Sequence, residues 1–218
     1  MKARSELKEF YKGWKTCIEA RLGEFSHHYD TCSDEDLFAE LAFCLFTPQS
    51  KALNCWRAVG ILTNKDLLLE GTCEDIAHQI NIVRFRNHKA QYLVNARKVF
   101  EHGGRIDVRG ALERFGPKKA FEAREWLVKN VKGLGYKEAS HFLRNIGWGS
   151  ELAILDRHIL KNLKVMGGIP DGKVPRTLTK KNYLAVEERM KVFSEEIGIP
   201  LDHLDLLLWC KETGEVFK

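Results

Sequence analysis

A turn containing two glycines, Gly133-Leu134-Gly135, separates two segments of helical periodicity in this 218-residue chain. Apolar residues recur at helical spacing on both sides of it: Ala123, Trp126, Leu127 and Val131 before, and Ala139, Phe142, Leu143 and Ile146 after. Paired glycines permit a left-handed backbone and let an anion approach without an intervening Cβ, while the N-terminus of the second helix offers free N–H groups. The pattern predicts a helix-hairpin-helix at about 124–147 that suits a nucleic-acid backbone.

Lys137 lies in the first turn of the second predicted helix, where the positive end of the helix dipole disfavours a cation. That position favours the free amine, the form in which lysine is a nucleophile. Asp156 lies 19 positions later, just before another apolar-periodic segment, and occupies an N-cap position. A carboxylate there can also stabilise a developing sugar cation or accept a proton. A solvated lysine and a simple capping aspartate are the ordinary interpretations of each residue alone.

Two segments carry a family resemblance, Gly133-Leu134-Gly135-Tyr136-Lys137-Glu138-Ala139-Ser140 and Leu155-Asp156-Arg157-His158. They resemble the helix-hairpin-helix superfamily of base-excision DNA glycosylases, and within it the minimal type of 8-oxoguanine DNA glycosylase/lyase. The resemblance continues through Arg97 and residues 206–218, so it covers nearly the whole chain. It implies an enzyme that flips 8-oxoguanine out of duplex DNA, excises it and cleaves the abasic site by β-elimination. It also implies that Lys137 forms the Schiff base and that Asp156 is the catalytic carboxylate.

The spacing of the cysteines disfavours a bound metal. The six cysteines are widely separated and include no Cys-x-x-Cys pair, which disfavours zinc and the iron–sulfur cluster of endonuclease III. We therefore expect neither a metal nor a cofactor. A glycosylase/lyase for another oxidised base and a non-catalytic helix-hairpin-helix DNA-binding module remain the alternative functions. Without a signal peptide or a long apolar run, we expect an intracellular monomer that uses double-stranded DNA and no membrane.

The net charge of +5 is mildly basic, so the location of the cations matters more than their number. One group flanks the hairpin: Lys129, Lys132, Lys137 and Arg144. From it, Lys132 joins Gly133 and Gly135 as the predicted contacts to the DNA backbone. A second basic group surrounds Phe85 and comprises Arg84, Arg86, His88 and Lys89. A solvated helix face is the ordinary interpretation of that second group.

A pocket for 8-oxoguanine must distinguish its N7–H donor from the N7 acceptor of guanine, which requires a protein acceptor opposite N7. The resemblance implicates the last lysine of the chain, here Lys218, whose α-carboxylate or ammonium could lie near the base. Phe85 and Trp209 are candidates to stack on the extruded purine. For both aromatic residues the alternative is core packing.

Gln49 follows Phe46-Thr47-Pro48 at the end of an apolar helix. The resemblance implies that it fills the gap left by the extruded nucleotide, and the alternative is a polar residue that starts the next helix. His158 could support Asp156 or contact the DNA backbone, although a helix-surface or core histidine is the more ordinary interpretation.

Helical periodicity predicts an all-α fold. Ser33-Asp34-Glu35-Asp36 and Thr72 to Asp75 are typical of capping boxes, the first opening a helix that runs to Phe46. Further helices are predicted at 4–21, 50–61, 88–101, 118–131, 136–146, 179–197 and 201–212, with a loop from Gly167 to Pro175 and no strand. Residues 1–218 should form a single helix-hairpin-helix glycosylase unit of two lobes, in which the N-terminal and C-terminal helices form the second lobe. The site is expected in the cleft between the lobes.

Overall fold

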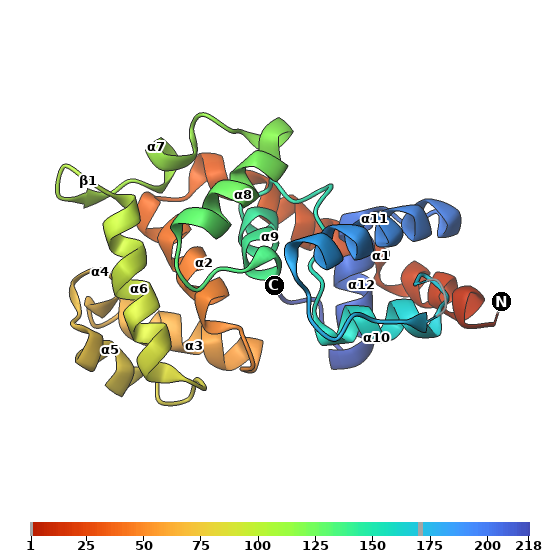
Figure 1. Ribbon diagram of the computed structural model, residues 1–218, viewed down its shortest axis with the longest axis horizontal. Coiled ribbons are helices and arrows are strands. Elements are labelled where there is room, and N and C mark those ends of the chain that lie inside the picture. The colour runs from red at the N-terminus through yellow and green to blue at the C-terminus, as the bar shows by residue number, and fades with distance from the viewer. Residues whose placement is uncertain (1, 170–171) are drawn as a thin grey trace.

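The computed structural model describes residues 2–169 and 172–218, which fold into helices with one minimal β-hairpin (Figure 1). The helices are α1 (Lys2–Thr31), α2 (Asp34–Phe46), α3 (Ala52–Thr63), α4 (Leu67–Glu70), α5 (Cys73–Gln79), α6 (Arg86–Phe100), α7 (Val108–Leu112), η1 (Pro117–Lys119), α8 (Ala120–Asn130), α9 (Tyr136–Asn145), α10 (Arg157–Val165), α11 (Lys180–Ile197) and α12 (Leu201–Thr213). The predicted all-α class is confirmed.

The prediction that the chain contains no strand was wrong at one hairpin. β1 (Glu101–His102) pairs antiparallel with β2 (Arg105–Ile106). The turn between them is Gly103-Gly104, and both glycines have positive φ, at 59° and 77°. Two such glycines allow a tight hairpin of the primed type even where the flanking residues carry no alternating pattern.

Both predicted capping boxes are present. The Ser33 hydroxyl accepts a hydrogen bond from the Asp36 backbone N–H at 3.1 Å, and the Asp36 carboxylate accepts one from the Ser33 N–H at 3.1 Å. Thr72 and Asp75 repeat this arrangement at the start of α5. Each box satisfies backbone donors that a helix terminus leaves free, which is why these short signals fix where α2 and α5 begin.

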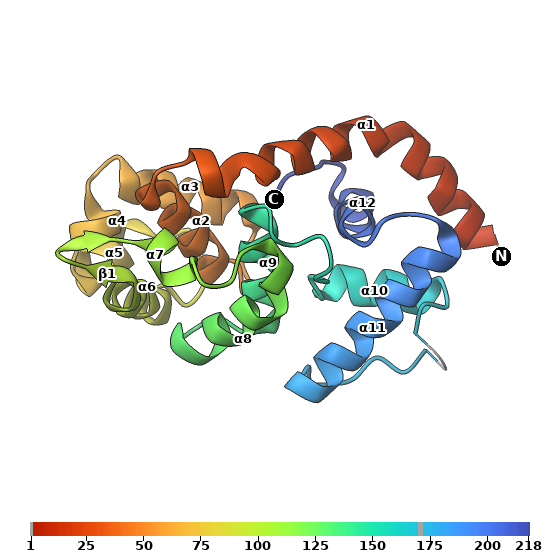
Figure 2. The same ribbon diagram turned by 90° about the horizontal axis from the view of Figure 1, so that it is seen from above.

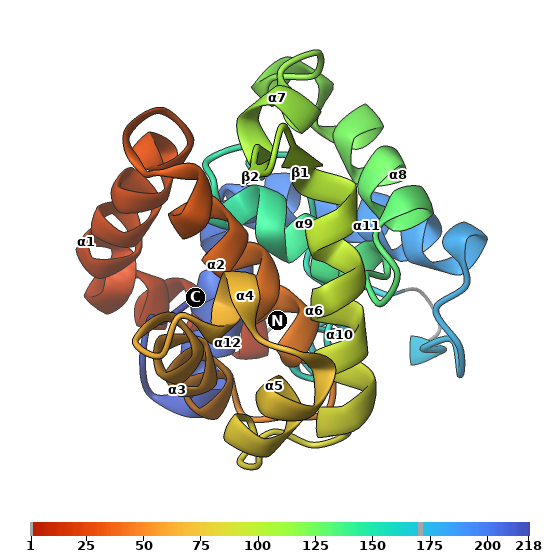
Figure 3. The same ribbon diagram turned by 90° about the vertical axis from the view of Figure 1, so that its left-hand side faces the viewer.

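Two separate hydrophobic cores divide the molecule into two lobes. The central lobe (α2–α9) is built around α2, which is buried at every residue from Leu37 to Phe46. Figure 3 views this lobe end on and shows α2 among α3, α6 and α9. The terminal lobe (α1 and α10–α12) has its own core, which includes Leu7, Ile18 and Leu207. Helix α1 contacts both α9 and α12, and Figure 2 shows it running from one lobe to the other.

Buried ion pairs connect the lobes across the chain. Arg124 of α8 donates to both carboxylate oxygens of Glu187 of α11, at 2.6 and 2.8 Å. Arg144 of α9 pairs with Asp205 of α12 at 3.2 Å. Breaking one partner of such a pair leaves a buried charge uncompensated, so these pairs fix how the lobes sit against each other.

The predicted Gly167–Pro175 loop includes residues 170–171, which lie outside the described residues. Around it, α10 ends at Val165 and α11 begins at Lys180. Within residues 2–169 and 172–218, no helix is long and apolar enough to cross a membrane.

Candidate active site

A cleft of about 1290 Å³ lies where the two lobes meet. Its walls come from the turn after α2, from α9, from the segment entering α10, from α12 and from the chain end. Predicted site residues from both lobes line it: Gln49, Lys137, Asp156, Trp209 and Lys218. The fold therefore gathers in one cavity five residues that are spread over most of the sequence.

Lys137 is the second residue of α9, and its side chain is 21% exposed. Its Nζ donates a hydrogen bond to the Thr47 hydroxyl at 3.2 Å and lies 3.9 Å from a carboxylate oxygen of Glu138. The Thr47 hydroxyl in turn donates to the Cys44 carbonyl at 2.9 Å, so it is oriented to accept from Lys137. A single moderate hydrogen bond and one distant carboxylate hold this amine loosely at the cleft wall.

Asp156 is the N-cap of α10, with an extended backbone at φ −93°. Its Oδ1 accepts hydrogen bonds from the N–H groups of His158 at 2.7 Å and Ile159 at 2.9 Å. Its Oδ2 has no hydrogen-bond partner among the described residues. Asp156 therefore caps the helix with one oxygen while the carboxylate lines the cleft, and the two interpretations of this residue are compatible.

Lys218, the last residue, has its side-chain ammonium inside the central lobe. The ammonium pairs with the carboxylate of Glu40 and lies 3.6 Å from the centroid of the Trp56 ring. Glu40 also accepts a hydrogen bond from Asn145 at 3.0 Å. The C-terminus lies beside the central lobe in Figure 2, after α12 has ended in the terminal lobe.

Phe85 is not among the residues that line this cleft, and its position does not fit core packing. It precedes α6 with a left-handed backbone at φ 57°, and its side chain is too exposed, at 52%, for core packing. It lines a separate depression of about 320 Å³ together with Pro48, Tyr92 and Gly133. The left-handed turn directs the ring outward, a local conformation that hydrophobicity alone does not reveal.

The hairpin glycines differ from each other. Gly133 has φ 102°, and a Cβ built there would lie 2.5 Å from the Tyr92 ring, so only glycine fits. Gly135 has φ −91° and an extended backbone, so of the two glycines only Gly133 uses the left-handed conformation that the pair permits. Gly135 and Lys132 are exposed beside the N-terminus of α9, the position expected of backbone-contacting groups.

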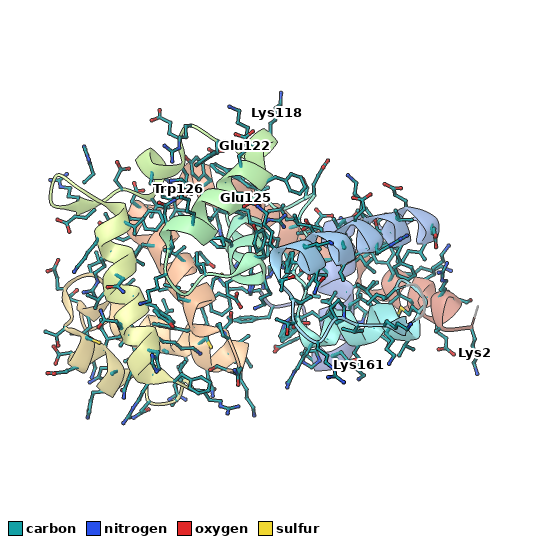
Figure 4. The ribbon with its side chains drawn as sticks, viewed as in Figure 1. Lys2, Lys118, Glu122, Glu125, Trp126 and Lys161 are labelled. Carbon is teal, nitrogen blue, oxygen red and sulfur yellow. The ribbon has the colours of Figure 1, made fainter. Side chains whose placement is uncertain are left out.

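The His158 side chain contacts α12 within the terminal lobe. Its Nδ1 lies 3.6 Å from Glu212 of α12, and its ring stacks on Trp209 with an interplanar angle of 10°. Lys161, one turn further along α10 and labelled in Figure 4, also pairs with Glu212 at 2.9 Å. His158 contacts the Asp156 carboxylate through its backbone N–H, and its ring has no hydrogen bond to that carboxylate within the described residues. Trp209 is thus stacked on one face while it lines the cleft.

Two further cleft residues escaped the sequence analysis. His141, one helical turn after Lys137, is buried, and neither ring nitrogen has a hydrogen-bond partner within the described part of the chain. Burial, together with Lys137 and Arg144, lowers the pKa of His141 well below its usual value, so the ring is neutral. Burial raises the pKa of Asp205 to about 7, which the neighbouring Arg144 opposes. The sequence held a signal for each residue: His141 lies at helical spacing from Lys137, and Asp205 is a charged residue inside the apolar run 204–208.

The lobes, the hairpin and the cleft define the helix-hairpin-helix glycosylase class of folds. Residues 18–199 match the family described as 8-oxoguanine DNA glycosylase, and the chain belongs to this family. The predicted resemblance is thereby confirmed.

Named relatives cover almost the full chain. A protein of Fusobacterium nucleatum named 8-oxoguanine DNA glycosylase/AP lyase is 46% identical over 98% of this chain and 97% of its own length. The protein of that name from Methanocaldococcus jannaschii is 37% identical over 94% of this chain and 93% of its own. A crystal structure of the Methanocaldococcus jannaschii enzyme in complex with a 15mer DNA containing 8-oxoguanine matches with a TM-score of 0.87, at 33% identity and covering 100% of both chains. The structure of the Thermotoga maritima 8-oxoguanine DNA glycosylase matches with a TM-score of 0.85, at 34% identity and covering 99% and 98%.

Proposed function

We propose that this protein removes 8-oxoguanine from duplex DNA and then cleaves the abasic site through a Schiff base on Lys137. One observation carries the proposal: an accessible lysine amine and a capped carboxylate, Lys137 and Asp156, line the same interlobe cleft. Family membership and the names of the full-length relatives support the substrate. A DNA substrate would place the protein inside the cell, and a monomer would suffice because residues of one chain line the whole cleft.

The reaction begins with extrusion of the damaged nucleotide, since C1′ is inaccessible inside the stacked duplex. The free amine of Lys137 attacks C1′ as the bond from C1′ to N9 breaks, and the base leaves with the bonding electrons and takes up a proton. The carboxylate of Asp156 stabilises the positive charge that develops on the sugar. Two features favour Asp156 here, since the helix N-terminus fixes its Oδ1 and its Oδ2 has no partner in the described residues.

The second half of the reaction uses the same covalent bond. Opening of the sugar ring converts the aminal at C1′ into an imine on Lys137. Loss of a proton from C2′ then expels the 3′ phosphate by β-elimination, and water releases the enzyme from the remaining imine. Every step uses side chains of this chain, the substrate and water.

The base would enter the part of the cleft lined by His141, Asp205, Trp209 and Lys218. The α-carboxylate of Lys218 would accept the N7–H of 8-oxoguanine, whereas guanine would present a lone pair to it. A buried contact of this kind discriminates by about 1–3 kcal/mol. The N1–H and N2–H₂ donors of the purine would suit the carboxyl group of Asp205, and Trp209 offers a face for stacking.

The duplex would lie over the hairpin side of the cleft. Lys132 and the backbone at Gly133 and Gly135 would approach phosphates, as the N-terminus of α9 favours, although the Gly135 N–H itself donates to Glu138 at 3.2 Å. Gln49, exposed at the cleft, would fill the gap beside the orphaned base. Phe85 would contact the duplex instead of the extruded base, because an exposed ring beside Arg84 can stack on nucleic acid.

Borohydride trapping tests this function, because borohydride reduces an imine to a stable covalent link. Duplexes carrying 8-oxoguanine, an abasic site or plain guanine would be incubated with the wild type, with Lys137→Gln and with Lys118→Gln. Lys118 is an exposed lysine at the edge of the central lobe, labelled in Figure 4, and serves as a matched control. We expect trapping on the 8-oxoguanine and abasic duplexes by the wild type and the control, and none by Lys137→Gln.

Other outcomes separate the alternatives. Trapping on the abasic duplex alone would retain Lys137 as nucleophile and assign the glycosylase to another damaged base. DNA binding without trapping or incision on any duplex would favour the non-catalytic DNA-binding module.

A further inference from the structure

Lys89, in the first turn of α6, is a buried lysine with only 3% of its surface exposed. Its Nζ donates hydrogen bonds to the carbonyls of Phe46 at 2.6 Å and Pro48 at 2.7 Å, and to the Ser50 hydroxyl at 3.0 Å. An ammonium carries three N–H donors, so these three acceptors match it completely. Phe46 is the last residue of α2, and Pro48 and Ser50 belong to the turn that follows α2 and contains Gln49.

The same turn stores backbone strain. Gln49 has φ 56° and Phe85 has φ 57°, and they are two of the three non-glycine residues with positive φ in the described part of the chain. The Ser50 hydroxyl, which accepts from Lys89, also accepts from the backbone N–H of Arg84 at 3.1 Å. Lys89 and Ser50 therefore join the Gln49 turn to the Phe85 turn. Left-handed conformations of such residues cost about 1–3 kcal/mol each and persist where the surroundings fix them.

We propose that Lys89 is a positioning residue that holds Gln49 at the cleft for gap filling. Its ammonium lies at the carbonyl end of α2, where the helix dipole favours a cation, and it fixes the carbonyls on either side of Thr47. This inference rests on the proposed function, because it assigns Gln49 a role in base extrusion. A merely structural cap would contribute to folding and affect every substrate alike.

The contact between Thr47 and Lys137 has its own support. The Thr47 hydroxyl donates to the Cys44 carbonyl, and the Thr47 N–H bonds to the carbonyls of Phe43 and Cys44 within the last turn of α2. Loss of the Lys89 bonds should therefore release Gln49 while the nucleophile keeps its neighbour. Chemistry at an abasic site in single-stranded DNA, where no partner base is orphaned, should not require Lys89.

Protonation of Lys89 provides a second prediction of the same proposal. Burial lowers the pKa of Lys89 to about 8, and the cations of Lys137 and Arg84 add to this, while Glu138 and Cys55 oppose it. Above that pH the neutral amine has two N–H donors for three acceptors, and its lone pair faces an oxygen. We expect the rate on duplex DNA, relative to single-stranded DNA, to fall as the pH rises through about 8.

The test compares Lys89→Met and Ser50→Ala with Lys98→Met, a control at an exposed lysine on the same helix. Two rates are measured: single-turnover excision of 8-oxoguanine from a duplex, and borohydride trapping on a single-stranded abasic oligonucleotide. Loss of charged hydrogen bonds should slow duplex excision by Lys89→Met about 10- to 100-fold, and by Ser50→Ala less, with single-strand trapping unchanged.

Three results would overturn the proposal. Equal losses on both substrates would make Lys89 a structural cap, and duplex excision by Lys89→Met equal to that of Lys98→Met would leave it without a role. If the melting temperature shows that Lys89→Met does not fold, the same two rates are measured for Ser50→Ala, and equal losses on both substrates would again make the contact a structural cap. A wild type that excises no 8-oxoguanine would instead overturn the proposed function, and with it this role for Lys89.

Discussion

The two walls of the cleft hold their functional groups in opposite ways. On the central wall, Lys137 has one hydrogen bond of 3.2 Å and its ammonium is otherwise close only to Glu138 at 3.9 Å within the described residues. On the terminal wall, Asp156 accepts two backbone N–H groups, and Asp205 is buried against Arg144. One wall offers a loosely held amine and the other offers carboxyl groups whose positions are fixed.

This difference matches what the two kinds of group must do. A nucleophile has to lose a proton, form a bond and move with the sugar, so strong hydrogen bonds to its ammonium would oppose the reaction. A group that stabilises developing charge acts best when its orientation is fixed before the reaction begins. Substitutions at Asp156 and Asp205 test the fixed wall, and an extension after Lys218 tests how the cleft recognises the base.

The largest effect is expected for Asp156→Asn. Asparagine is as good an N-cap as aspartate, so α10 should keep its first turn and the melting temperature should change little. Loss of the charge should slow 8-oxoguanine excision by about 10²- to 10³-fold, the usual effect of removing one electrostatic contact to a transition state. Single-turnover rates and melting curves measure the two effects. If Asp156→Asn both slows excision and lowers the melting temperature clearly below that of the wild type, the role of this residue is capping and not charge.

The chain end should have a smaller and more selective effect. A short Gly-Ser extension after Lys218 leaves its ammonium with Glu40 but moves the α-carboxylate away. If that carboxylate accepts N7–H, the preference for 8-oxoguanine over guanine should fall about 10- to 100-fold, as expected for one buried contact of this kind. Excision rates on matched 8-oxoguanine and guanine duplexes measure it, and an unchanged preference would exclude the α-carboxylate. Trapping on an abasic duplex, which has no base to recognise, should stay normal and serves as the control.

The smallest effect concerns stability as a function of pH. Burial raises the pKa of Asp205 to about 7, so the folded protein holds this proton at a pH where the unfolded chain has lost it. The resulting stabilisation is present at acidic pH, below the usual aspartate range, and is lost as the pH rises through about 7. Asp205→Asn cannot ionise and should flatten this dependence, changing the acid-to-neutral difference in melting temperature by about 2–4 °C for each kcal/mol of that stabilisation. If the melting temperatures of the wild type and Asp205→Asn change with pH in the same way, Arg144 keeps Asp205 ionised over the whole pH range.

Local signals explain most of what could be predicted about the fold. The capping boxes at Ser33 and Thr72, and the position of Asp156 before α10, depend on neighbours within one helical turn. The hairpin followed from glycine and apolar spacing in the same way. Residue type did not reveal backbone conformation everywhere: the strand pair joined by Gly103-Gly104 was missed, and the positive φ of Phe85 had no signal in the sequence.

The sequence by itself determined the helices, the hairpin, the family and the pair Lys137 and Asp156 as candidates, since each depends on short patterns of residues. Only the tertiary structure placed these two residues on opposite walls of one cleft. It also paired Lys218 with Glu40, 178 positions away, and surrounded Lys89 with three acceptors. Such contacts depend on how two hydrophobic cores pack against each other, and no local pattern encodes that geometry.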